Sequence, residues 1–232
     1  KQFHKSSPKT YNNYRHNLSH LWQELSIDSG MTSNIWKLVS RPARMTGEVY
    51  RPFTDDEIQK ILENSETFWR SASIISCHTG LRLKDIVLLE WKQIDFETKE
   101  IKLIPHKIAR YNKTIAIPLH DDILAMLKDV PKTDKKYVFP EVIHRHRENS
   151  EFHTVFTNIL ETSGIKDNDK GIVGFHSWRK TFTTNASSAG IELEEIRKMV
   201  GHSKIEMTEH YDHSKVTDKL RNMKSITKVP NK

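Results

Sequence analysis

The sequence predicts a mainly helical protein with a small antiparallel β-sheet, an α+β fold. Apolar residues recur at helical spacing from Tyr11 to Leu25 and through most of the chain after Pro118. Strand-like runs occur in one stretch only, residues 93–117. At 232 residues the chain can bury one good-sized core, or a core with a small appended module.

The amino-terminal region predicts a long helix that begins at Ser7-Pro8, followed by a short helical piece over residues 34–39. A segment with Pro42, Gly47 and Pro52 follows and is typical of a linker. We therefore expect two domains, residues 1–47 including the linker and residues 48–232.

The second region begins with Thr54-Asp-Asp-Glu57, a capping box that predicts the start of a helix. The expected helices cover residues 54–62, 66–77, 83–89, 121–128, 151–163, 176–189, 193–200, 204–210 and 214–225. The expected strands cover residues 93–96, 101–104 and 114–117, with a basic loop over 105–113. His144–Arg147 is expected in a further exposed basic loop.

Composition narrows the class of protein. No apolar stretch approaches the roughly 18 residues that span a bilayer, so we expect no membrane segment and a cytoplasmic protein. Cys77 is the single cysteine, which excludes an internal disulfide and a cysteine-based zinc cage. The chain begins with Lys1 and lacks a signal peptide, which suggests a fragment of a longer protein.

Positive charge is concentrated near the amino terminus. Residues 1–53 hold eight Lys or Arg against three Asp or Glu, in a chain with a net charge of +7. Such a balance favours a polyanionic partner, and we expect double-stranded DNA. The residues expected to contact its backbone are Lys9, Arg15, Arg41, Arg44, Arg110 and Lys113.

Five widely spaced residues suggest phosphoryl-transfer chemistry: Arg82, His176, Arg179, His202 and Tyr211. Guanidinium groups bind phosphate oxygens in a bidentate way, imidazoles move protons near neutral pH, and a phenol can act as a nucleophile. Taken singly, each has an ordinary structural explanation. The combination is more specific than any single residue. Thr79-Gly-Leu-Arg82, His176-x-x-Arg179 and Gly201-His202 occur in this order, followed by the late tyrosine.

This ordered set resembles the tyrosine recombinase family, the phage-integrase type of site-specific DNA recombinase, from about Ser7 to Ser225. The resemblance implies a catalytic domain preceded by part of a helical core-binding domain. It implies two catalytic arginines, Arg82 and Arg179, with His176 as base and His202 as a phosphate contact. Tyr211 corresponds to the nucleophile, and Asp85 to a supporting acidic position. Asp85 lies one turn beyond Arg82, where its carboxylate is expected to hold that guanidinium by a charge-assisted bond.

Lys107 corresponds to the family's hairpin lysine, although Lys113 and Lys102 compete with it. Two departures from the family pattern are Val200 in place of leucine before Gly-His and the large Trp178 inside the His-x-x-Arg motif. Neither departure removes a functional group.

The resemblance implies DNA cleavage and rejoining through a 3′-phosphotyrosyl link, without metal or ATP. It also implies a homo-oligomer, a tetramer on paired sites, with accessory DNA-bending proteins as further partners. Three alternatives stay open: a type IB topoisomerase, a non-catalytic DNA-binding module, and a metal-dependent nuclease suggested by His210-Tyr-Asp-His213.

Overall fold

The computed structural model describes residues 8–30, 33–39, 49–112, 114–148, 151–201 and 218–226. The chain divides into two compact units, Lys1–Glu48 and Val49–Lys232. This division lies immediately beside the boundary suggested by the linker composition.

The first unit contains the long helix α1 (Pro8–Ser29) and the 3₁₀ helix η2 (Ile35–Lys37). Asn34 caps η2 by accepting from the Trp36 backbone N–H, and its amide donates to the Ser19 carbonyl at 3.0 Å. Arg15 Nη1 donates to the Trp36 carbonyl at 3.1 Å. These side-chain bonds hold the short helix against the long one.

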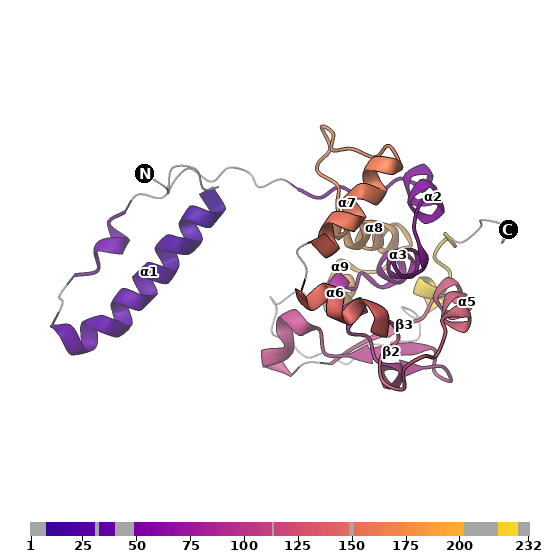
Figure 1. The fold of residues 1–232 in the computed structure, drawn as a ribbon, viewed down its shortest axis with the longest axis horizontal. Helices are drawn as coiled ribbons and strands as arrows, with labels where there is room; N and C mark the ends of the chain where they lie inside the picture. Colours follow the sequence, from indigo (N-terminus) through magenta and orange to yellow (C-terminus); the bar gives the residue numbers. More distant parts are fainter. Residues whose placement is uncertain are drawn as a thin grey trace. The chain divides into compact units, whose positions relative to one another are not determined.

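The second unit is mainly helical with a small sheet, which confirms the predicted fold class (Figure 1). Its α-helices are α2 (Asp55–Glu63), α3 (Thr67–Thr79), α4 (Leu83–Val87), α5 (Asp121–Asp129), α6 (Ile143–Glu148), α7 (Glu151–Thr162), α8 (His176–Ser188) and α9 (Leu193–Val200). Its 3₁₀ helices are η3 (Trp91–Gln93), η4 (His106–Tyr111) and η5 (Pro140–Val142). Its strands are β1 (Ile94–Asp95), β2 (Glu100–Leu103) and β3 (Ile115–Pro118).

Helix α3 forms the centre of this unit and packs against α4, α5 and α8 (Figure 1). Every residue from Ser71 to Thr79 is buried, as expected for a helix surrounded by protein on all sides. Trp178 and Phe182 of α8 are fully buried, and the Trp178 ring meets the Phe53 ring edge-on at 4.7 Å. The core therefore fixes the relative positions of α3 and α8.

The sheet is antiparallel in the order β1-β2-β3. Ile101 in the middle strand pairs with Ile94 on one side and with Ile117 on the other, and all three are buried. Lys102, which points to the opposite face, pairs with Ala116. One face of the sheet thus packs on the helices, and the segment between β2 and β3 connects the ends of these two strands.

Two segments differ from the sequence-based prediction. The expected basic loop over residues 105–113 contains η4, and the expected loop over His144–Arg147 is the helix α6. In the second case the preceding turn η5 has Pro140 at its start, and the buried Val142 and Ile143 anchor the segment to the core. Burial of these two side chains favours a helix where charge alone suggested a loop.

The carboxyl-terminal residues 218–226 pack on the same chain. Leu220 and Met223 are buried, and Asp122 accepts from Ser225 Oγ at 2.5 Å and from the Ile226 N–H at 2.8 Å. The predicted helix over 204–210 and residues 214–217 of that over 214–225 lie outside the described residues. Of the remainder, residues 218–221 are helical and residues 222–225 are not. Within the described part of the chain, no helix is long and apolar enough to cross a membrane.

Candidate active site

Arg82 lies at the amino end of α4, directly after a turn that requires glycine. Gly80 ends α3 with φ +65°, and a Cβ at this position would lie 2.7 Å from a Phe182 ring carbon and 2.8 Å from Val200 Cγ1. Arg82 Nη1 is buried and has no hydrogen-bond partner among the described residues. The described residues therefore leave part of the hydrogen-bonding capacity of this guanidinium unused.

Arg179 joins three motifs that are distant in the sequence. Its Nη1 donates to the Gly80 carbonyl at 2.7 Å, and its Nη2 donates to the Val200 carbonyl. Burial lowers the pKa of Arg179 to about 9, with a further contribution from the positive charge of Arg82, while Asp85 acts in the opposite direction. The two guanidiniums are therefore close enough to repel each other, and a phosphate between them would relieve this repulsion.

His176 is the first residue of α8 and lies one helical turn before Arg179, as the i, i+3 spacing predicts. Partial desolvation lowers the pKa of its imidazole, and the positive charges of Arg179, Arg82 and Lys107 add to the effect in that order. The imidazole is consequently neutral at pH 7 and able to accept a proton. Tyr50, which the sequence analysis did not single out, places its ring 5.4 Å from the His176 ring at 32°.

Lys107 lies near the start of η4 with its side chain exposed. Its positive charge contributes to the lowered pKa of His176, so Lys107 lies within electrostatic reach of that imidazole. The competing Lys102 is paired with Glu100 at 3.0 Å and with Asp95 at 3.9 Å, and Lys113 lies outside the described residues. Of the two candidates that the structure describes, only Lys102 is paired with carboxylates, and the choice between Lys107 and Lys113 stays a prediction.

The hydrogen-bond partner of the Asp85 carboxylate differs from the expected one. We expected a charge-assisted bond to Arg82, but no such bond is present between these two described residues. Asp85 Oδ1 instead accepts from the His106 backbone N–H at 2.8 Å. The buried carboxylate therefore connects α4 to the segment that carries Lys107.

The remaining predicted residues divide into those that lie outside the described residues and those that lie inside them. Arg41, Arg44, His202 and Tyr211 lie outside, and for the last two the description stops at Gly201, at the end of α9. Lys9 belongs to α1, Arg15 is half-buried against Trp36, and Arg110 is exposed on η4. The structure thus brings Arg82, Lys107, His176 and Arg179 together and leaves the other assignments as predictions.

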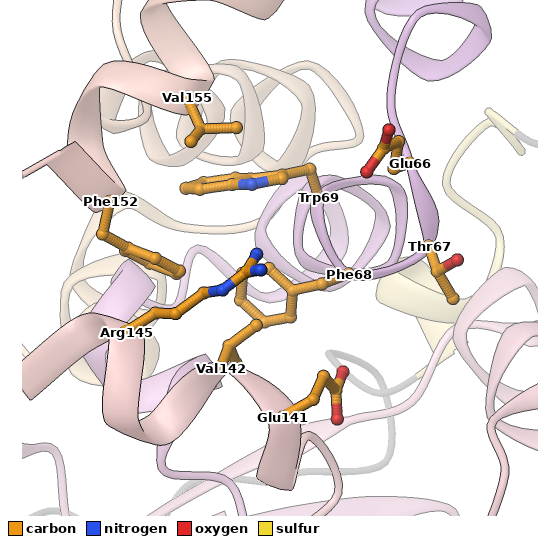
Figure 2. A pocket seen from close by; sticks show the side chains of 9 residues that line it. All are labelled: Glu66, Thr67, Phe68, Trp69, Glu141, Val142, Arg145, Phe152 and Val155. Atoms are coloured by element: carbon orange, nitrogen blue, oxygen red, sulfur yellow. The ribbon is translucent and has the colours of Figure 1, made fainter. Parts of the chain in front are cut away.

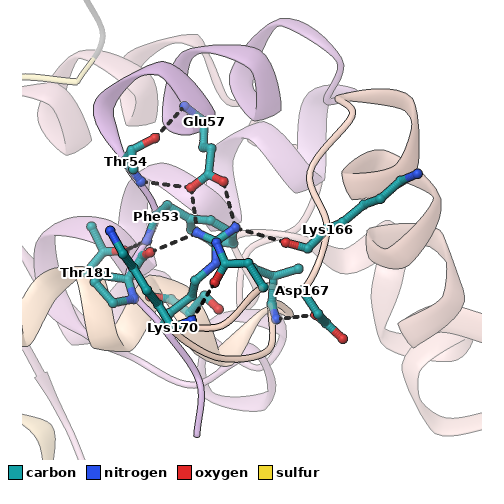
Figure 3. A network of polar contacts seen from close by, with 12 residues as sticks. Phe53, Thr54, Glu57, Lys166, Asp167, Lys170 and Thr181 are labelled. Atoms are coloured by element: carbon teal, nitrogen blue, oxygen red, sulfur yellow. Dashed lines mark hydrogen bonds and ion pairs between the residues drawn. The ribbon is translucent and has the colours of Figure 1, made fainter.

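A second buried arginine was missed by the sequence analysis. Arg51 donates to both carboxylate oxygens of Glu57, at 2.8 and 2.7 Å, and to the Lys166 carbonyl at 3.1 Å. Glu57 also completes the capping box of α2 with Thr54, as Figure 3 shows. The capping box was visible in the sequence, but its connection to residue 166 had no local signal.

A buried cluster of His78, His120 and Asp122 has residue types that bind metals. The two imidazole rings are stacked, with centroids 3.9 Å apart and planes 3° from parallel. Because the lone pair of an imidazole nitrogen lies in the ring plane, parallel stacked rings cannot both point at one ion. His78 Nε2 instead bonds Asp122 at 3.1 Å, and His120 Nε2 donates to the Met223 carbonyl at 2.9 Å. This cluster fastens the carboxyl-terminal segment.

A pocket of 470 Å³ lies between the start of α3, the η5–α6 turn and α7. Phe68, Trp69 and Phe152 line it together with Arg145 (Figure 2). None of the predicted catalytic residues lines this pocket. Duplex DNA is expected to bind an extended basic surface, whereas this pocket is lined mainly by aromatic and apolar side chains with one arginine.

Comparison with known proteins gives one family. The model described as the phage integrase family matches residues 51–217. The integrase of Salmonella phage P22 is 28% identical over 193 residues, which are 75% of this chain and 48% of the relative. A XerC-like tyrosine recombinase of Caldanaerobacter subterraneus is 26% identical, over 69% of this chain and 50% of the relative. The chain therefore spans about half the length of these two relatives.

Solved structures support the same fold. A lambda integrase dimer bound to a COC′ core site has a TM-score of 0.62 at 23% identity, covering 87% of this chain and 77% of that one. The integrase from mycobacterium phage Brujita has a TM-score of 0.63 at 17% identity, covering 95% of this chain and 74% of that one. At these identities the likeness concerns the fold.

Proposed function

Because the chain belongs to the phage integrase family, we propose that it is a site-specific DNA recombinase that acts through a covalent 3′-phosphotyrosyl intermediate on Tyr211. The family match over residues 51–217 includes all the proposed catalytic positions. The observation that carries the proposal is the position of Arg179, which bonds the carbonyls of Gly80 and Val200 and thereby gathers three motifs around one basic site.

In the proposed cleavage step, the Tyr211 oxygen attacks the phosphorus of a DNA phosphodiester. A P–O bond to tyrosine forms as the bond to the 5′ oxygen breaks, and that oxygen leaves with the electron pair. His176 accepts the phenolic proton, and Lys107 supplies a proton to the 5′ oxygen. The new phosphodiester retains the bond energy, so the freed 5′-hydroxyl of a partner strand can reverse the step without ATP.

The two arginines supply the electrostatic part of the mechanism. Arg82 and Arg179 hold the non-bridging oxygens and neutralise the charge that grows on the five-coordinate phosphorus, a role that a metal ion has in other enzymes. The mutual repulsion of the two guanidiniums favours this anionic state. His202 donates a further hydrogen bond, and Asp85 supports the site by holding His106.

We propose double-stranded DNA as the partner, bound by the amino-terminal unit and the catalytic unit together. The proposed backbone contacts are Lys9, Arg15, Arg41, Arg44, Arg110 and Lys113. Binding by many such contacts weakens steeply as salt rises. We further propose a homotetramer on paired sites in the cytoplasm, associated with the nucleoid when bound, with accessory DNA-bending proteins.

The test uses nicked duplexes that trap the covalent state, because the short strand beyond the cleavage site diffuses away. A randomised pool of such duplexes is incubated with the chain, captured DNA is sequenced, and the modified residue is mapped by mass spectrometry. We expect the adduct on Tyr211, its loss in Tyr211→Phe, and no loss in the matched variant Tyr137→Phe. An adduct that persists in Tyr211→Phe would contradict the assignment.

Two labelled copies of the captured site then separate recombination from DNA relaxation. A recombinase exchanges strands between the two labels, whereas a type IB topoisomerase relaxes supercoiled DNA without exchange. Cleavage at full rate in excess chelator is expected, since the proposed chemistry uses no metal ion.

A further inference from the structure

The segment that carries Lys107 is held to α4 at two points through one residue, His106. The first point is the backbone bond in which the His106 N–H donates to Asp85 Oδ1 at 2.8 Å. This N–H belongs to the first residue of η4, and Pro105, the N-cap residue before it, provides no side-chain cap. The buried Asp85 therefore takes the place of a cap.

The second point involves the two side chains. Lys84 Nζ lies 2.6 Å from His106 Nε2. Because an ammonium group only donates, Nε2 must be the acceptor, and the ring proton of His106 is on Nδ1. Lys84 and Asp85 both belong to the first turn of α4, directly after Arg82. A single helical turn thus holds the residue before Lys107 and presents the first arginine.

This arrangement matters because a lysine side chain has four rotatable bonds on an exposed segment. To protonate a leaving oxygen it must be held within hydrogen-bond reach of that oxygen while the arginines hold the same phosphate. We propose that His106 is a positioning residue, which the bonds to Lys84 and Asp85 lock onto α4 so that Lys107 keeps its place relative to Arg82. The inference rests on the proposed function of Lys107 as the proton donor.

The sharpest test compares two leaving groups. In one captured nicked duplex the 5′-bridging atom is oxygen, and in the other it is sulfur. A thiol has a pKa of about 8.5, so a thiolate departs without a proton donor, whereas an alkoxide needs one. A variant that fails only in proton delivery is slow on the oxygen substrate and normal on the sulfur substrate.

We expect Lys107→Ala to slow cleavage of the oxygen substrate on the order of a hundredfold or more, with the sulfur substrate cleaved at nearly the wild-type rate. His106→Leu should show the same pattern with a loss on the order of tenfold. His106→Gln is the matched control, because its side-chain oxygen can still accept from Lys84, and it should retain most of the rate. Lys84→Met should resemble His106→Leu, and the double variant His106→Leu/Lys107→Ala should be no slower than Lys107→Ala alone.

Several outcomes would overturn the inference. An equal loss of rate on both substrates in His106→Leu would mean general damage to the site, and no loss at all would mean that the contact has no role. If Lys113→Ala, and not Lys107→Ala, is slow on the oxygen substrate and normal on the sulfur substrate, the proton donor is Lys113. Failure of the proposed function is distinguishable, since the wild-type chain would then form no covalent adduct with either substrate.

Discussion

Two arginines of the catalytic unit are almost equally buried, and they differ in what surrounds their charge. Arg51 is 6% exposed and Arg179 is 8% exposed. Arg51 faces Glu57, and the hydrogen bonds between them raise the pKa of the arginine and lower that of the glutamate. Arg179 faces two backbone carbonyls and lies near Arg82, and its pKa falls to about 9.

The difference separates a structural charge from a functional one. The carboxylate of Glu57 neutralises the Arg51 charge through two hydrogen bonds, although Arg51 Nε has no hydrogen-bond partner among the described residues. Removal of one partner would leave the other charge uncompensated in the protein interior. Around Arg179 the described residues offer neutral oxygen atoms and a second cation, with only Asp85 acting against the repulsion. The repulsion between the two guanidiniums lowers the stability of the protein without ligand, and a bound anion would reduce that repulsion.

The largest expected effect comes from replacing Arg82, whose Nη1 has no hydrogen-bond partner among the described residues. Arg82→Gln should reduce the rate of covalent trapping on the order of a hundredfold or more, because it removes a donor aimed at the transition state. The same variant should melt at an equal or higher temperature than the wild type, since it removes the repulsion on Arg179. The measurements are single-turnover trapping and thermal unfolding, with Arg221→Gln as the control for loss of one positive charge. Unchanged trapping would contradict the proposed site.

Replacement of Arg51, whose charge is paired with Glu57, should lower the stability and leave the trapping rate unchanged. Arg51→Met leaves the partly buried Glu57 carboxylate without its partner and should lower the free energy of unfolding by about 3 kcal/mol. Below its melting transition, this variant should trap DNA at the wild-type rate.

The double variant Arg51→Met/Glu57→Gln provides the control for this prediction, because it removes both charges while glutamine can still complete the capping box with Thr54. It should recover much of the lost stability. Denaturant unfolding measures the loss and the recovery. A double variant that is less stable than Arg51→Met would show that the pair is not the source of the effect.

The sequence predicts local features of this site well, because their signals lie in neighbouring residues. The turn Thr79-Gly-Leu-Arg82 needs a glycine with positive φ, and a His-x-x-Arg spacing places two side chains on one helical face. The capping box at Thr54 and the strands around Ile101 also follow from short-range patterns.

Contacts between distant segments could not be predicted in the same way. Tyr50 meets His176 across more than a hundred positions, and Asp85 meets the His106 backbone rather than Arg82. A backbone N–H has no side-chain signature, and six residues of 3₁₀ helix are too few to produce a periodic pattern. The helix α6 was missed because its charged residues outweighed the two buried side chains before them.

A smaller effect is expected when a simple anion replaces DNA. Sulfate at about ten times its dissociation constant stabilises the folded chain by about 1.4 kcal/mol, which corresponds to roughly 3–6 °C in melting temperature. Chloride at matched ionic strength controls for screening, and the general effect of sulfate on all proteins is removed by comparison between variants. We expect Arg51→Met to retain the specific increase and Arg82→Gln to lose most of it. An equal increase in both would mean that the anion does not use the paired guanidiniums.

The smallest expected effect is a shift in pH dependence. In the proposed mechanism His176 must be neutral to accept the Tyr211 proton, and its pKa lies below the ordinary 6.5 because of desolvation and three nearby positive charges. The rate at low DNA concentration reports the free protein, so the midpoint of its acid limb should lie below pH 6.5. On the sulfur substrate, where no proton donor is needed, Lys107→Met should move this midpoint to higher pH, because it removes one of the positive charges.

Lys107 has the smallest influence among the three cations, which is why the expected shift is modest. Arg51→Met is the control, since its charge does not act on His176 and the acid limb should stay in place. An acid limb with its midpoint above pH 6.5 in the wild type would contradict the assignment of His176 as the base. If the midpoint lies below pH 6.5 but Lys107→Met leaves it unchanged, the lysine is not held close to the imidazole. The proposed attachment of the Lys107 segment to α4 would then be wrong.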